Sequence, residues 1–302
     1  MTLLAAPPAI RRLGKSDIRI STLAWGMWRL SGTVDQAARL AHAALDSGIT
    51  LFDTADIYGF DGSGGFGDAE SLFGGVLRAD RSIRDRIVLA TKGGIMPPLP
   101  YDQSDAYLTG ALDASLKRLG VDRIELYQIH RPDILTHPHE VARTLENAIS
   151  AGKIATIGVS NMTISQIATL QQFLGATPIA STQPEISPLR IDCFENGELD
   201  QAMEMGMTVL AWSPLGGGRL VDPQTDRDRA VAASLDAAAA PVGISRTAAA
   251  YSWLMAHPAG ITPIIGSQQA SRITEAADAY KLTWARTMWY DVLVAARGEN
   301  LP

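Results

Sequence analysis

Short apolar runs alternate along the chain with longer segments whose apolar residues recur every three or four positions. Eight of the short runs are predicted strands. Most are almost continuously apolar, which is typical of parallel strands buried on both faces. These runs are residues 22–27, 50–53, 87–91, 124–129, 154–159, 179–183, 208–212 and 262–265.

The longer segments have the signals of helices. Thr33 is a predicted N-cap, apolar residues follow it at helical spacing up to Leu45, and Gly48 suits the left-handed position after a helix. Further helices are predicted within residues 104–119, 133–150, 163–174, 195–205, 226–240, 245–256 and 283–297. Eight strands alternating with helices predict an α/β protein with a closed (β/α)8 TIM barrel.

The ends of the chain add to this barrel. Two short β-rich runs, residues 10–12 and 18–20, flank a Gly-Lys-Ser-Asp turn and predict a hairpin. No shift of composition marks a boundary, so we expect one domain over residues 1–302. It comprises a hairpin at about 9–20, a barrel at about 21–280, and a C-terminal helix and tail at about 283–302.

Composition excludes several classes of protein. Hydrophobic residues at 46% and charged residues at 19% are unlike a disordered chain. The net charge of −6 provides no general attraction to nucleic acid or anionic lipid, and the single cysteine excludes an internal disulfide. No stretch approaches the roughly 20 apolar residues of a membrane helix, and the first residues lack the order of a secretory signal. We therefore expect a cytoplasmic protein, and the sequence leaves its oligomeric state open.

Titratable residues stand at the ends of three neighbouring predicted strands. Asp53, Lys92 and His130 end the second, third and fourth strands, and Tyr58 follows on the next loop. Each alone has an ordinary structural explanation, but in a barrel all four meet at one mouth. Lys92 is expected to pair with Asp53 and to lower the pKa of Tyr58. The set suits proton delivery to a carbonyl oxygen, and it requires a bound hydride donor.

Several motifs containing these residues resemble the signature of the aldo-keto reductase superfamily, most closely bacterial oxidoreductases of the YdhF type. They are GITLFDTADIYG at 48–59, LATK at 89–92, LYQIHRPD at 126–133 and GVSN at 158–161. The resemblance implies a (β/α)8 barrel that reduces aldehydes and ketones with a nicotinamide cofactor, usually NADPH. It assigns Tyr58 as the general acid, Lys92 and Asp53 as its supporting ion pair, and His130 as the group that orients the carbonyl.

The same resemblance assigns cofactor contacts. Ser160, Asn161 and Gln183 match residues that hold the nicotinamide carboxamide, and Trp212 matches an aromatic that stacks on the ring. Further contacts are implied at Met27, at Ser213, Pro214, Leu215, Gly216, Gly217 and Arg219 of the pyrophosphate loop, and at Gly266, Ser267, Gln269 and Arg272 of the adenosine segment.

The choice between NADPH and NADH depends on that segment. Arg272 matches an arginine near the adenosine 2′-phosphate, and guanidinium binds phosphate in a bidentate way. Gly266 and Gln269 stand at the positions where many relatives carry a lysine, and Ala276 where many carry an adenine-contacting asparagine. NADPH is predicted, and NAD remains possible.

The predicted substrate is a small carbonyl compound. Trp25, Trp28, Tyr58, Met96 and Trp212 are expected to form an aromatic, apolar mouth, with Trp28 and Met96 in the substrate pocket. No metal is expected, because His137 and His139 have no partners at zinc-like spacing.

Two other functions compete with that of a carbonyl reductase. Residues 62–67 fit the G-x-G-x-x-G fingerprint of a Rossmann dehydrogenase, but they lie nine residues beyond Asp53, and no acidic residue ends the next strand. A flexible loop at the mouth is the better interpretation. A nucleotide-binding regulatory or redox-sensing subunit with slow turnover is the second alternative. Asp53, Tyr58, Lys92 and His130, called the tetrad below, are all present, and this favours the enzyme.

Overall fold

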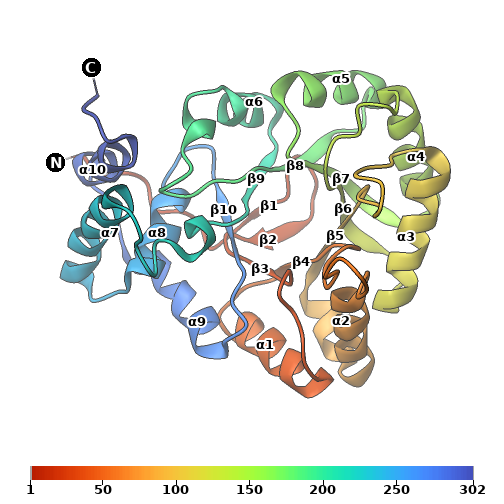
Figure 1. The fold of residues 1–302 in the computed structure, drawn as a ribbon, viewed down its shortest axis with the longest axis horizontal. Coiled ribbons are helices and arrows are strands. Elements are labelled where there is room, and N and C mark those ends of the chain that lie inside the picture. The colour runs from red at the N-terminus through yellow and green to blue at the C-terminus, as the bar shows by residue number, and fades with distance from the viewer. Residues whose placement is uncertain (1, 302) are drawn as a thin grey trace.

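Eight parallel strands close into a barrel in this computed structural model, which describes residues 2–301 (Figure 1). Around the barrel the order is β10-β3-β4-β5-β6-β7-β8-β9. The strands are β3 (Ala24–Gly26), β4 (Leu51–Asp53), β5 (Val88–Gly93), β6 (Ile124–Ile129), β7 (Ile154–Ser160), β8 (Ile179–Gln183), β9 (Thr208–Ala211) and β10 (Thr262–Ile265). The predicted TIM barrel is confirmed, and each of the eight predicted runs overlaps one of its strands, with ends that differ by at most two residues.

Helices surround the barrel, with α7 and α10 side by side at its margin (Figure 1). They are α1 (Val34–Asp46), α2 (Asp68–Ala79), α3 (Asp105–Leu119), α4 (Pro138–Ser150), α5 (Ile164–Leu174), α6 (Glu198–Met205), α7 (Asp226–Ala239), α8 (Arg246–Met255), α9 (Ala270–Glu275) and α10 (Arg286–Arg297). Short 3-10 helices are η1 (Arg81–Arg86), η2 (Asp192–Phe194), η3 (Gly216–Gly218), η4 (Ala240–Val242) and η5 (Ala276–Lys281).

The predicted helix signals act as expected at several ends. Thr33 caps α1 in a capping box, in which its hydroxyl accepts from the Gln36 amide and the Gln36 side chain accepts from Thr33 N–H. Helix α2 was not predicted. Its N-cap, Gly67, makes no side-chain hydrogen bond, and two internal glycines weaken the helical pattern, so the usual signals are missing.

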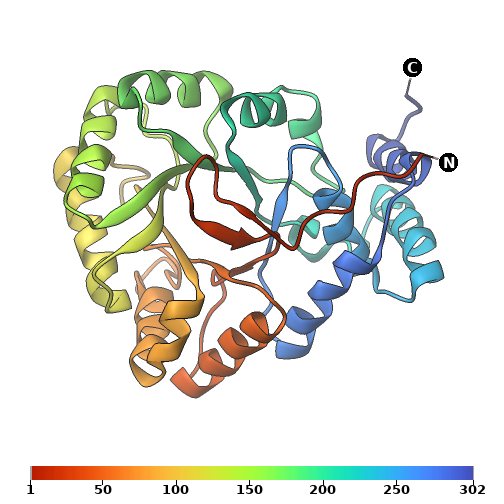
Figure 2. The ribbon, with the colours of Figure 1, turned by 180° about the vertical axis from the view of Figure 1, so that it is seen from behind.

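The predicted N-terminal hairpin is also present, and it closes the barrel at the N-terminal ends of the strands. Strands β1 (Ile10–Arg12) and β2 (Arg19–Ser21) pair antiparallel. Leu13 and Ile20 are fully buried against inward-facing residues of the barrel such as Leu126. Figure 2 shows the hairpin lying across the barrel. Gly14 has φ +56°, and a Cβ there would come within 2.5 Å of the Ala180 carbonyl oxygen, so only glycine fits.

Side chains alternate between the inside and the outside of the barrel. Leu51, Ala90 and Leu126 face the hairpin cluster, whereas their neighbours Phe52 and Leu89 pack against the helices. Two residues beyond Leu51, Ala90 and Leu126 come the polar residues Asp53, Lys92 and Gln128. This period of two places a polar layer above the apolar plug, at the carboxyl ends of the strands.

Candidate active site

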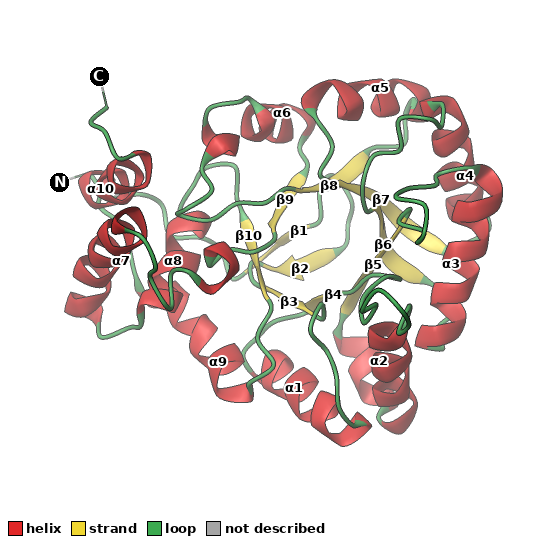
Figure 3. Ribbon diagram, in the orientation of Figure 1, coloured by secondary structure: helices red, strands yellow, loops and turns green. Residues whose placement is uncertain are grey.

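The four titratable residues singled out in the sequence meet at the carboxyl end of the barrel. Asp53 ends β4, Lys92 lies near the end of β5, and His130 directly follows β6. Tyr58 comes from the β4–α2 loop. Loops of this kind cross the face of the barrel opposite to the hairpin (Figure 3).

Lys92 is the centre of the cluster. Its ammonium donates hydrogen bonds to Asp53 Oδ2 at 2.6 Å, to the Thr54 carbonyl at 2.9 Å and to Tyr58 Oη at 3.0 Å. All three donor positions of the buried ammonium are therefore used. The His130 ring packs edge-on against the Tyr58 ring, with the ring centroids 5.8 Å apart.

The electrostatics correct one sequence prediction. Burial raises the pKa of Tyr58 above its usual value, and the nearby Lys92 charge opposes this only in part. The expectation that Lys92 makes the phenol more acidic is therefore wrong as a net effect, because loss of solvent outweighs the cation. Burial alone would lower the pKa of Lys92, but Asp53 and Tyr58 raise it overall, so the ammonium stays charged.

The pKa of His130 is shifted downward, whereas that of Lys92 is shifted upward. Burial, followed by the charges of Lys92 and Arg131, holds the pKa of His130 well below its usual range. The imidazole is therefore neutral near pH 7 and donates from one nitrogen only. A protonated phenol, a fixed ammonium and a neutral imidazole together suit proton donation to a carbonyl oxygen.

The predicted carboxamide-binding residues lie beside this cluster. Ser160 Oγ donates to the Gln183 carbonyl at 2.8 Å, and Asn161 Nδ2 donates to Ser160 Oγ at 2.7 Å. Trp212 Nε1 donates to Asn161 Oδ1 at 3.0 Å. The structure thus brings four predicted cofactor residues together. Asn161 has φ +56°, a rare conformation for a residue other than glycine and one common at functional sites.

The predicted pyrophosphate loop follows β9. Ser213 has φ +53°, and residues Gly216, Gly217 and Gly218 all have positive φ in η3. A Cβ at Gly217 or Gly218 would meet no atom within 4 Å, so space is open beside their backbone. Pro214 and Leu215 lead into this turn. The N–H groups of Gly216, Gly217 and Gly218 donate within the turn, to the Ser213 carbonyl, to Ser213 Oγ and to the Leu215 carbonyl, so the predicted pyrophosphate contact of this loop remains a prediction.

Arg219 and Met27, two predicted cofactor residues, make contacts within the protein. Arg219 binds the carboxylate of buried Asp228 through Nε at 3.0 Å and through Nη2. Its guanidinium is therefore fixed at the start of α7, and its predicted phosphate contact remains a prediction. Met27 is fully buried, its side chain packs in the larger hydrophobic core, and its N–H donates to the Asp53 carbonyl at 2.9 Å, so its predicted cofactor contact remains a prediction.

The predicted adenosine segment runs from β10 into α9. Gly266, Gln269 and Arg272 are exposed, and Ser267 Oγ accepts from Gln269 N–H at 3.1 Å. Within residues 2–301, Arg272 makes no salt bridge, so its guanidinium is available to an anion. The amide of the adjoining Gln268 is buried with no partner among the described residues.

The predicted aromatic mouth is only partly correct. Trp28 is exposed at the end of β3 and Met96 is half-buried on the β5–α3 loop. The prediction that Trp25 lines the mouth is wrong. It is fully buried and packs edge-on against Phe52, with the ring centroids 5.1 Å apart, because its position on β3 faces the helices.

Two residues near the site were not singled out from the sequence. Gln128, two residues before His130, bonds Asp53 Oδ1 at 3.1 Å, and the inward period of two along β6 was the available signal. Arg131 follows His130, and its guanidinium lies 5.9 Å from the centre of the Trp212 ring. No hydrogen bond from that guanidinium to another described residue is present.

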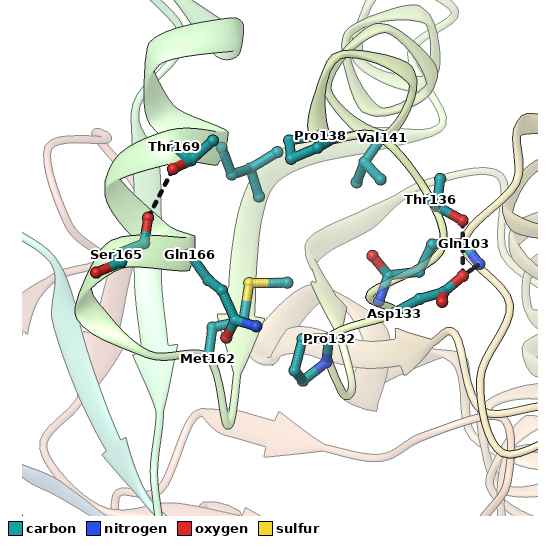
Figure 4. Close-up of a pocket in the computed structure, with 11 residues that line it drawn as sticks. Gln103, Pro132, Asp133, Thr136, Pro138, Val141, Met162, Ser165, Gln166 and Thr169 are labelled. Carbon is teal, nitrogen blue, oxygen red and sulfur yellow. Dashed lines mark hydrogen bonds between the residues drawn. The ribbon is translucent and has the colours of Figure 1, made fainter.

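A cavity of about 210 Å³ lies behind the mouth, between α4 and α5 (Figure 4). Its wall includes Pro132, Asp133 and Met162, which follow His130 and Asn161 in sequence. The Asp133 carboxylate already accepts bonds from Thr136 and from backbone N–H groups. None of Asp53, Tyr58, Lys92 and His130 lines this cavity.

Two kinds of feature are absent from residues 2–301. No three His, Cys, Asp or Glu side chains are grouped so that they could hold a metal ion. No helix in this range has the length and apolar character needed to cross a membrane.

The sequence of residues 22–291 matches the profile of the Aldo/keto reductase family. The chain belongs to the aldo/keto reductase family. A 6-dehydroglucose reductase of Novosphingobium aromaticivorans is 67% identical over 305 residues, which cover 100% of both chains. Oxidoreductase YdhF of Escherichia coli is 33% identical, covering 93% of this chain and 95% of its own, so the expected resemblance is confirmed.

A solved structure agrees with the family at the level of the fold. A thermostable aldo-keto reductase, Tm1743, crystallised with the inhibitor epalrestat, has a TM-score of 0.81 at 23% identity. The match covers 95% of this chain and 99% of that one. Membership of the family establishes that the protein is an oxidoreductase that acts on carbonyl compounds with a nicotinamide cofactor.

Proposed function

We propose that this protein is an NADPH-dependent reductase that converts a sugar aldehyde into an alcohol, with 6-dehydroglucose as the first candidate substrate. The observation that carries the reaction type is the chain of contacts from Asp53 through buried Lys92 to Tyr58. The candidate substrate comes from the relative that is 67% identical over its whole length. Its name describes a glucose whose carbon 6 is oxidised, which places an aldehyde at the end of a polar molecule.

Tyr58 supplies the proton in this proposal. A nicotinamide nucleotide, when bound, would supply the hydride for the carbonyl carbon, and Tyr58 Oη–H would protonate the carbonyl oxygen, which gives an alcohol. Lys92, 3.0 Å from Tyr58 Oη, stabilises the phenolate that remains. Neutral His130 donates a hydrogen bond to the same oxygen and holds the carbonyl beside Tyr58.

The mouth suits a hydroxylated substrate. Arg131, the residue after His130, offers a charged donor, and Trp28, two residues beyond β3, exposes an aromatic ring. Sugar rings present hydroxyl groups at their edges and C–H groups on their faces, so both features match a hexose. The exposed guanidinium of Arg272 supports NADPH over NADH.

A regulatory subunit with slow turnover is the competing function. Such a subunit has no need of a completed proton-donating site. The intact contacts around Lys92 therefore favour the enzyme.

Replacing Tyr58 tests the proposal. The rate of NADPH oxidation is measured with 6-dehydroglucose and with a panel of other aldehydes and ketones. We expect Tyr58→Phe to lower kcat by about 100-fold or more, because the general acid is lost, while the NADPH dissociation constant changes by less than about twofold. Tyr290→Phe, an exposed position on α10, is the matched control. Wild-type kcat in Tyr58→Phe would show that the acid is misassigned, and no turnover by the wild type with any carbonyl would favour the regulatory alternative.

A further inference from the structure

Gln128 lies at the centre of the polar layer, between the tetrad and the predicted cofactor site. Its side chain is fully buried inside the barrel. Its Nε2 donates to Asp53 Oδ1 at 3.1 Å, and its Oε1 accepts from Gln183 Nε2 at 3.1 Å. Gln183 Nε2 donates at 3.1 Å to the same oxygen of Asp53.

This triangle fixes which way both amides face. A carboxylate can only accept hydrogen bonds, so each Nε2 must point toward Asp53. Exchanging O and N in either amide would place two acceptors against each other. The Oε1 of Gln183 is therefore the end turned away from Asp53, and it has no donor among residues 2–301.

We infer that Gln128 is a positioning residue for the cofactor. It holds the Gln183 amide so that Oε1 faces outward as an acceptor, ready for the N–H2 of the nicotinamide carboxamide. Because it also donates to Asp53, it links that contact to the ion pair that supports Tyr58. The inference rests on the proposed use of a nicotinamide nucleotide, and adds a residue that touches neither substrate nor cofactor.

Gln128→Met tests the inference by binding alone. Methionine matches the length of glutamine but makes neither hydrogen bond. We expect NADP+ to bind about five- to tenfold more weakly, which is the loss of roughly one hydrogen bond. Adenosine 2′,5′-bisphosphate, which lacks the nicotinamide, should bind as it does to the wild type. Both dissociation constants are measured by calorimetry.

Gln201→Met is the matched control. Gln201 is also a buried glutamine with one hydrogen bond, from Nε2 to the Ile164 carbonyl at 2.9 Å, but it lies on α6 outside the barrel. We expect this variant to bind both ligands as the wild type does.

Gln128→Glu gives a second, independent readout. A protonated glutamic acid can supply the one donor and the one acceptor that Gln128 uses here, whereas its carboxylate repels Asp53. NADP+ affinity of this variant should therefore improve toward the wild-type value as the pH falls from about 8 to about 5.5. Gln128→Met should show no such recovery.

The outcomes separate the inference from the proposed function. Unchanged NADP+ binding by Gln128→Met, or equal weakening of both ligands, overturns the inference while the proposed function stands. If Gln128→Met does not fold, a pH-independent NADP+ affinity in Gln128→Glu overturns it. Wild-type protein that binds neither NADP+ nor NAD+ overturns the proposed function and the inference with it.

Discussion

At the scale of single residues, burial decides which charges the protein tolerates. Lys92 is buried but charged, because three acceptors surround it. Asp56, between Asp53 and Tyr58, is buried with no hydrogen-bond partner for either oxygen among the described residues. Burial and then repulsion from Glu70 raise the pKa of Asp56 well above its usual range, so the fold favours the protonated form of this carboxyl.

Asp56→Asn is expected to stabilise the protein at alkaline pH. A raised folded-state pKa means that wild-type stability is highest below the unfolded pKa and declines as the pH rises toward the folded one. Asparagine does not titrate, so its advantage in melting temperature should grow from about pH 4 to about pH 8. Thermal unfolding of both proteins across this range measures it. An advantage of equal size at both ends would show that Asp56 is not the titrating group.

At the scale of elements, the two ends of the barrel have different roles, one in stability and the other in chemistry. The β1–β2 hairpin covers the N-terminal end with Leu13 and Ile20, and the carboxyl ends carry the polar layer. Stability and chemistry are therefore carried at opposite ends, as is usual for this fold.

Leu13→Ala tests this division. Removing a fully buried leucine from the plug should lower the free energy of unfolding by about 2–5 kcal/mol. Denaturant unfolding measures that loss. Below the melting transition kcat and KM should stay at wild-type values, because Leu13 does not contact the tetrad. A kcat loss above about threefold in folded Leu13→Ala would show that the two ends are coupled.

At the scale of the whole molecule, distant parts of the chain meet in one body. Residues 2–4 lie beside residues 284–286, where Leu4 N–H donates to the Trp284 carbonyl at 2.8 Å, and α10 packs on α7. We therefore propose that residues 1–302 act as one domain. The net charge of −6 does not oppose an anionic cofactor, because the exposed guanidinium of Arg272 acts locally and distant surface charges are screened.

The preference for NADP+ over NAD+ should be measurable as a larger stabilisation of the folded protein by NADP+. NADP+ at 100 times its dissociation constant should stabilise the fold by about 2.7 kcal/mol. Arg272→Ala should weaken NADP+ by about tenfold, the loss of a charged hydrogen bond, and leave NAD+ unchanged. Thermal shifts with both nucleotides measure this. A larger shift with NAD+ than with NADP+ in the wild type would reverse the proposed preference.

The sequence by itself determined the barrel, its hairpin and the four tetrad positions, because these depend on local periodicity and on residues at strand ends. Helix α2 was not predicted from the sequence, because its N-cap is a glycine, which has no side chain to cap the helix. The tertiary structure decided what depends on contacts between distant strands. Trp25 faces the helices, Arg219 pairs with Asp228, and Gln128 joins Asp53 to Gln183. The tertiary structure also decided the direction in which the pKa of Tyr58 shifts. Burial raises it more than the charge of Lys92 lowers it, and this balance exists only after the chain has folded.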